Sequence, residues 1–206
     1  MSEEPDSSLG DVASNLALRT VVRNVAFLNL GYFGIEFAVA LAIGSVSLFA
    51  DSVDFLEDGA INLLILAGLG FTPLLRARLG MLLAVIILVP GLATLWTAWQ
   101  NFFDVHVPEA VPLSITGLGA FAVNLACERM LAPFKTSGGS LTRAAFLSAR
   151  NDVLANVAIV LAGLLTAATA SRWPDLIVGL GIAAINAGAA LEVYNSAREE
   201  HLSARP

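Results

Sequence analysis

The sequence is poor in the residues on which several classes of protein depend. Its single cysteine, Cys127, excludes an internal disulfide and a thiolate-rich metal site, and the chain has only 2 histidines. Only 14% of the residues are charged, and the 11 lysines and arginines form no basic block, which argues against nucleic-acid binding. No cleavable signal peptide is expected, because the first apolar run, from Val21, is too long for one.

Apolar sequence is what the chain has in excess. Hydrophobic residues make up 57% of the 206 residues, and the mean hydropathy is +0.77. A soluble domain of this size could not cover so much apolar surface, so we expect a membrane protein. A helix needs about 20 apolar residues to cross the hydrocarbon core. Six runs qualify and predict an all-α, polytopic six-helix bundle: 21–43, 46–73, 79–102, 110–132, 144–170 and 174–196.

The composition divides the chain into three parts. Residues 1–18 form a polar tail that we expect to be disordered, residues 19–197 form the membrane domain, and residues 198–206 form a short carboxy-terminal tail. Turn residues separate the apolar runs. These breaks are Gly44-Ser45, Pro73, Pro108 with Pro112, Ser137-Gly138-Gly139-Ser140 and Trp173-Pro174-Asp175.

Positive charges predict the orientation of the bundle. If both termini are cytoplasmic, the inner segments hold ten of the 11 cations and the outer segments hold only Arg172. The positive-inside rule therefore favours both termini in the cytoplasm. Trp96, Trp99 and Trp173 fall near the opposite interface, where indole rings anchor. We expect a multi-pass protein of the cell membrane, in contact with the lipid bilayer.

Carboxylates interrupt two of the apolar runs. Asp54 and Asp58 in the second run share a helical face, and Asp51 lies near the same stripe. Ser148 and Asp152 in the fifth run are also four residues apart. An ionisable group in the middle of a membrane is costly, so each is a functional hypothesis by default. Interhelical hydrogen bonds are expected instead from the asparagines, among them Asn29, Asn124 and Asn156.

The carboxylates of the two runs reach a similar depth. At about 1.5 Å per residue, Asp54 and Asp58 overlap with Asp152 near the middle of a core about 30 Å thick. One four-coordinate site could therefore draw on both helices. Repulsion between the carboxylates would be relieved by a bound divalent cation or by protonation of one of them. Asp51 stays open between a ligand and a helix amino-terminal cap, and Glu57 points roughly 100° away from Asp58, towards a role in packing or proton relay.

The second run resembles the cation diffusion facilitator family of metal/proton antiporters. That family's second helix typically opens with a Gly/Ser turn, continues Ser-x-(Ala/Ser)-Leu-(Leu)-Ala-Asp-(Ala/Ser), and then has (His/Asp)-x-x-x-Asp. Residues 44–58 read GSVSLFADSVDFLED in this chain. The resemblance covers about 20–196, and further positions look similar to family positions: Asn29, Glu36, Asp152-Val153 and Trp173-Pro174-Asp175.

The resemblance implies a transporter with a metal site of Asp54, Asp58, Ser148 and Asp152. The family usually has His or Asp where this chain has Ser148, so the fourth ligand would be weaker or replaced by Asn151. The activity implied is efflux of a divalent transition-metal cation in exchange for protons, by a homodimer with no resident cofactor. We expect the chain to lack the cytoplasmic metal-binding domain that follows the sixth helix in most members.

The donor atoms indicate the kind of cation. Zinc favours nitrogen and sulfur ligands, whereas a site of oxygens alone favours Mn²⁺ or Fe²⁺. The preference is mild, because family sites with Asp at the first position of the second helix also handle Zn²⁺.

Two alternative functions remain. An intramembrane aspartyl protease also needs carboxylates on two helices, but the sequence has no Gly-x-Gly-Asp and we expect no enzyme. A non-transporting membrane partner or regulatory subunit with a decayed metal site is the second alternative, because Ser148 weakens the ligand set.

Overall fold

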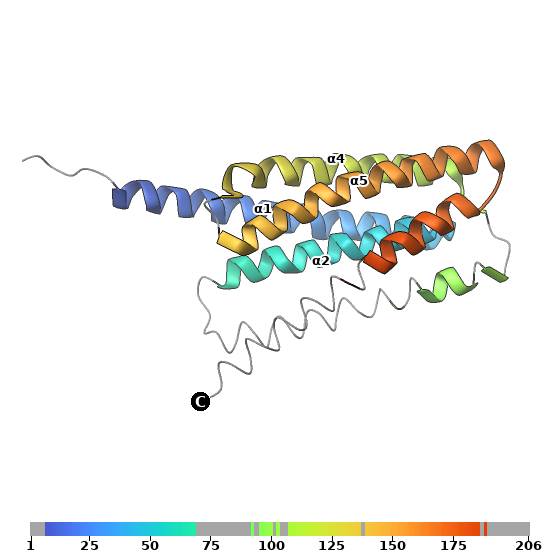
Figure 1. Ribbon diagram of the computed structural model, residues 1–206, viewed down its shortest axis with the longest axis horizontal. Coiled ribbons are helices and arrows are strands. Elements are labelled where there is room, and N and C mark those ends of the chain that lie inside the picture. The colour runs from blue at the N-terminus through green and yellow to red at the C-terminus, as the bar shows by residue number, and fades with distance from the viewer. Residues whose placement is uncertain are drawn as a thin grey trace, which may run out of the picture.

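Helices are the only regular elements in the described part of the chain. The computed structural model describes residues 7–68, 92, 95–100, 102–103, 107–136, 139–185 and 188. The long helices are α1 (Ser7–Ile43), α2 (Val46–Gly68), α4 (Ala110–Leu131) and α5 (Gly139–Thr169) (Figure 1). The short helix η1 (Ala132–Phe134) follows α4, and an apolar helix, Trp173–Ile185, follows α5. The predicted all-α class is confirmed for these residues.

Within the described residues, three stretches of helix are long and apolar enough to cross a membrane. They are Leu16–Ile43, Ala110–Phe134 and Ala145–Thr169. The helix α2 also has a spanning length of 23 residues, although it carries four carboxylates between Asp51 and Asp58. The chain is therefore a membrane protein with several apolar helices. Most of the predicted span 79–102, part of 174–196, the Pro73 turn and the tail 198–206 lie outside the described residues, so the count of six helices stays a prediction.

The helix boundaries correct three of the predictions. Residues 7–18 are not a disordered tail but part of α1, because each residue added to an existing helix gains a backbone hydrogen bond. The helix α5 begins at Gly139, inside the predicted 137–140 break. Pro112 lies in the first turn of α4, where its missing N–H costs no helical hydrogen bond, and so it does not separate two spans.

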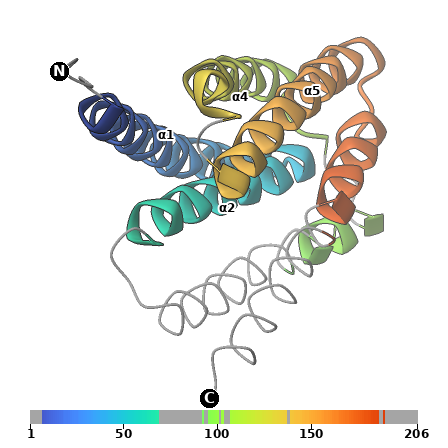
Figure 2. The same cartoon turned by 60° about the vertical axis from the view of Figure 1, so that its left-hand side comes forward.

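The four long helices form two antiparallel pairs. The helix α1 lies beside α2 and α4 lies beside α5, while contacts of α1 with α4 and of α2 with α5 join the pairs (Figures 1 and 2). Ring pairs with centroids 5.0 Å apart, Tyr32 with Phe55 and Phe37 with Phe49, connect α1 to α2.

Two apolar clusters close the two ends of this bundle. One includes Leu48, Leu113 and Ile159, near the connection between α1 and α2. The other includes Val22 and Ala149, towards the opposite end. The carboxylates of α2 lie in the layer between these clusters, so the core is apolar, then polar, then apolar along the bundle axis.

The start of α2 is capped from the far end of the chain. The Asp175 carboxylate accepts hydrogen bonds from Val46 N at 2.8 Å and Ser47 N at 3.2 Å. It also accepts from the hydroxyls of Ser45 at 2.7 Å and Ser47 at 2.5 Å. These bonds satisfy N–H groups that the first turn of a helix cannot satisfy by itself. The chain reaches this point through Gly44, whose φ of 64° is one that glycine adopts without strain.

The capping residue of α2 is therefore not Asp51. Ser45 occupies that position, since its Oγ accepts from Leu48 N at 3.2 Å in the usual N-cap arrangement. Asp51 lies inside the helix and is fully buried. The hypothesis that Asp51 caps the helix is wrong.

The Trp173–Ile185 helix also approaches α2 closely at Gly179. A Cβ atom at Gly179 would lie 2.6 Å from the carbonyl carbon of Val46 and 2.7 Å from Ser47 N. Backbone atoms at the start of α2 cannot move aside without loss of the Asp175 cap. Gly181, two residues on, has no atom within 4 Å of such a Cβ.

We expect Gly179→Ala and Gly181→Ala to change stability in opposite directions. Gly179→Ala forces a clash with backbone and should destabilise the fold by about 1–3 kcal/mol. Gly181→Ala should stabilise it by about 0.5–1 kcal/mol, because alanine is the better helix former. Thermal unfolding of the two purified variants in the same detergent measures both. Equal shifts in one direction would contradict the close approach.

Candidate metal centre

Two hydrogen bonds set the register between α2 and α5. Ser148 Oγ donates to Asp58 Oδ1 at 2.9 Å, and Asn156 Nδ2 donates to Asp51 Oδ2 at 2.6 Å. Because the helices are antiparallel, Asp152, midway between Ser148 and Asn156, lies at the level of Asp54. The structure thus brings the polar positions of the fifth apolar run opposite those of the second.

Asp58, Asp152 and Ser148 form one group. The carboxyl groups of Asp58 and Asp152 lie within hydrogen-bonding distance of each other, and Ser148 donates to Asp58. Asp58 is 4% exposed, and Asp152 is partly buried. Among the neighbouring charges, Asp152 acts most strongly on Asp54, which is also partly buried. Asp58, Asp152 and Ser148 are therefore in contact across α2 and α5, and Asp54 is close enough for its charge to interact with that of Asp152.

Asp51 belongs to a second group, nearer the connection between α1 and α2. Its carboxyl group lies within hydrogen-bonding distance of that of Glu36 on α1. Asn156, which binds its other side, accepts from Asn124 Nδ2 of α4 at 3.1 Å. Asn124 and Asn156 thus form the interhelical hydrogen bond that the sequence predicted. Asn29 Oδ1 on α1 likewise accepts a long hydrogen bond from Cys127 Sγ of α4, at 3.8 Å.

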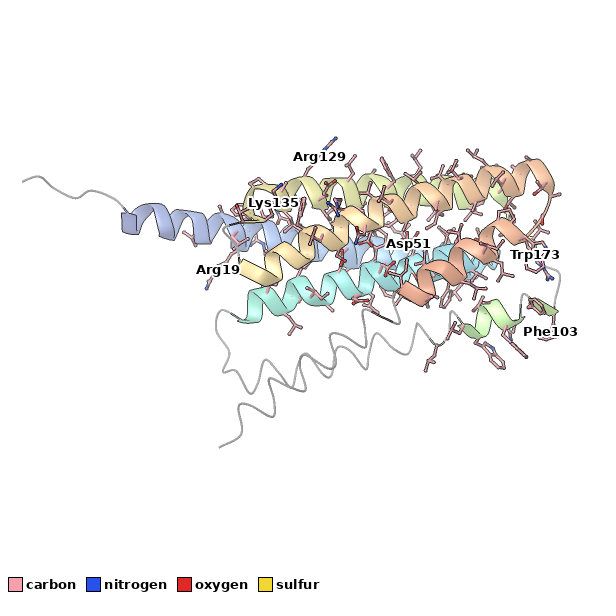
Figure 3. The ribbon with its side chains drawn as sticks, in the orientation of Figure 1. Arg19, Asp51, Phe103, Arg129, Lys135 and Trp173 are labelled. Atoms are coloured by element: carbon pink, nitrogen blue, oxygen red, sulfur yellow. The ribbon has the colours of Figure 1, made fainter. Side chains whose placement is uncertain are left out.

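Cations and aromatic rings gather at opposite ends of the bundle. Figure 3 shows Arg19, Arg129 and Lys135 at one end, Trp173 and Phe103 at the other, and Asp51 between them. Aromatic rings contact one another at the second end. The ring centroids of Trp99 and Phe103 are 4.9 Å apart, and those of Phe102 and Trp173 are 6.3 Å apart. This is the distribution that the positive-inside and aromatic-belt tendencies produce.

The comparison with family models decides what kind of protein this is. The model of the cation efflux transmembrane domain matches residues 79–200, more than half of the chain. The chain belongs to the cation efflux family. The match includes Ser148 and Asp152 but begins after α2, so it confirms from separate residues the resemblance seen at 44–58. No curated protein matches the chain.

As a cation efflux protein, the chain is a cation transporter by family, and members of this family are transporters rather than enzymes. The structure does not bring every predicted site residue to the centre. Asn151 is exposed on α5, about 100° around the helix from Asp152, and lies away from the group. Glu57 is buried, and its charge acts on Asp54 and Asp152; the predicted role in packing or proton relay stays a prediction.

The carboxylates described in this cation efflux protein do not form a complete set of metal ligands. Among the residues that the structure describes, no three Asp, Glu, His or Cys side chains converge closely enough to hold one ion. The carboxyl groups of Asp58 and Asp152 lie within hydrogen-bonding distance of each other, and the charge of Asp54 interacts with that of Asp152. Glu36 looks similar to a family position in the sequence, and its contact with Asp51 depends on the α1–α2 register.

Proposed function

We propose that this protein exports a divalent transition-metal cation across the cell membrane in exchange for protons. The observation that carries the proposal is the layer of carboxylates between two apolar clusters, in which Asp58 is buried and Asp54 and Asp152 are partly buried. Charge in such a place is costly and needs a compensating positive charge. For a family of cation transporters, the transported ion is the natural source of that charge.

The proposed ligands are Asp54, Asp58 and Asp152, with Ser148 as the fourth donor. A divalent cation attracts all three carboxylates, so its arrival would draw Asp54 towards the Asp58–Asp152 pair and close the cage. All of these donors are oxygens, which favours Mn²⁺ or Fe²⁺, with Zn²⁺ as a weaker substrate. The exposed position of Asn151 removes it from this proposed set.

Proton exchange follows from the contact between Asp58 and Asp152. Two carboxyl groups at hydrogen-bonding distance must share either a proton or a cation, because two bare negative charges there repel strongly. Release of the metal on one side of the membrane therefore favours uptake of a proton from that side. The proton leaves when the next cation binds, which couples the two movements.

Alternating access would open one apolar cluster at a time. The end with Arg19, Arg129 and Lys135 is the proposed cytoplasmic end, and both termini are proposed to lie in the cytoplasm. The homodimer implied by the family resemblance remains part of this proposal. A non-transporting regulatory subunit is the alternative, favoured by Ser148 in place of a stronger ligand.

Removal of one carboxylate should abolish transport. Asp58→Asn and Asp152→Asn each leave too few charged oxygens to replace the water shed by the cation. Transport should fall below about 1% of wild type. This loss is larger than the 10–100-fold loss of metal affinity or activity that is typical when a residue supporting a metal ligand is replaced. Mn²⁺ uptake into proteoliposomes, scaled to the inserted protein, measures it, with Glu109→Gln at an exposed position as the control. Wild-type protein without uptake of Mn²⁺, Fe²⁺ or Zn²⁺ would favour the regulatory subunit instead.

Substitutions of Ser148 should change selectivity rather than abolish transport. Ser148→Ala removes a neutral hydroxyl that water can replace, so Mn²⁺ transport should fall only a few-fold. Ser148→His places an imidazole beside Asp58 and should raise the ratio of Zn²⁺ to Mn²⁺ transport by at least about tenfold. The measurement is uptake of both ions by each variant. An unchanged ratio in Ser148→His would place Ser148 outside the cage.

Metal affinity should depend on pH because protons and metal compete for the same oxygens. As pH falls, more carboxyl groups are protonated, so the apparent affinity for Mn²⁺ should fall by up to about tenfold per pH unit for each proton displaced. Titrations of purified protein with Mn²⁺ between pH 8 and pH 5 test this. An affinity that is flat across this range would refute the proton exchange while leaving the metal site intact.

A further inference from the structure

Glu36 is a buried carboxylate that the proposed transport site does not use. Its side chain is 0% exposed, and no hydrogen-bond donor among the described residues reaches Oε1 or Oε2. Asp51 is also 0% exposed, and no hydrogen-bond donor among the described residues reaches its Oδ1. Three carboxylate oxygens without a donor therefore meet in one enclosed place, since the two carboxyl groups lie within hydrogen-bonding distance.

The surroundings orient this pair. Asn156 Nδ2 donates to Asp51 Oδ2 at 2.6 Å, and Asn124 Nδ2 donates to Asn156 Oδ1 at 3.1 Å. The two amides from α4 and α5 thus hold Asp51 by one oxygen and leave Oδ1 as its unengaged oxygen. A side chain fixed in this way is typical of a ligand supported by residues behind it.

The pair is separate from the proposed transport site. Asp51 and Asp58 are two helical turns apart on α2, about 10 Å along the axis. Their partners on α5 also differ, Asn156 for Asp51 and Ser148 for Asp58. Asp54 lies between them and interacts most strongly with Asp152.

We propose that Glu36 and Asp51, oriented by Asn156, form a second binding position for a hard divalent cation. Two carboxylates supply two negative charges, which one divalent ion neutralises, and oxygen donors without nitrogen or sulfur suit Mn²⁺ or Mg²⁺. Binding here does not require the proposed transport. If transport occurs as proposed, this is the position between the metal centre and the α1–α2 end of the bundle.

The test uses a protein from which the first site has been removed. The variant Asp58→Asn/Asp152→Asn, as a full-length chain in detergent, should still bind one Mn²⁺ per chain, whereas wild type should bind two. Addition of Glu36→Gln should reduce this to none, and addition of Glu36→Asp, which keeps the charge, should retain binding within about tenfold. Equilibrium dialysis with metal analysis and the paramagnetic signal of free Mn²⁺ give the number bound.

Several outcomes are decisive. A folded Asp58→Asn/Asp152→Asn protein that binds no Mn²⁺ overturns the inference, and the Glu36–Asp51 contact is then a shared proton only. Binding that survives Glu36→Gln overturns it as well. If the double variant does not fold, Glu36→Gln alone should lower saturation from two ions to one, and an unchanged value refutes the site. Glu109→Gln is the matched carboxylate control. If the wild-type protein does not transport metal, the proposed function is refuted. The number of Mn²⁺ ions expected to bind per chain does not change.

Discussion

Repulsion among buried carboxylates is the constraint on which the rest of this structure depends. Six of them, four from α2 together with Glu36 of α1 and Asp152 of α5, share one layer of the bundle, where the effective dielectric is low and each uncompensated charge costs several kcal/mol. Such a layer persists only if other parts of the fold hold it in place. The apolar clusters on both sides of the layer supply that stability.

Most of these carboxylates lie on α2, and the neighbouring helices pack against its charged sides. Its carboxylates face α1 and α5, so the helix that is least suited to lipid contacts protein on its charged sides. The helices around it present leucine, isoleucine and phenylalanine outwards, as Phe27, Ile115 and Leu154 illustrate at more than 60% exposed. The cost of charge in the membrane is thus confined to the interior of the bundle.

The sequence predicted the parts of this arrangement that depend on spacing within one helix. Asp54 and Asp58 share a face because they are four residues apart, and the depth of Asp152 followed from its distance to the helix end. Contacts between helices were harder to predict. The pairing of Asp51 with Glu36 depends on the register between α1 and α2. The cap of α2 by Asp175 joins two turns that show no relation to each other in the sequence. The early start of α1 was missed because polar residues hid a continuing helix.

The Asp175 cap also bears on how the protein is made. About 130 residues separate Ser45 from Asp175, so at 5–20 residues per second the acceptor for the first N–H groups of α2 appears on the order of 10 s after α2 itself. During that interval the most charged helix lacks both its cap and its α5 partners. Until the Trp173–Ile185 helix has been made, the first N–H groups of α2 therefore need water as their hydrogen-bond partner. The packing of α2 is then completed only after the Trp173–Ile185 helix has been made, although α2 itself is made much earlier.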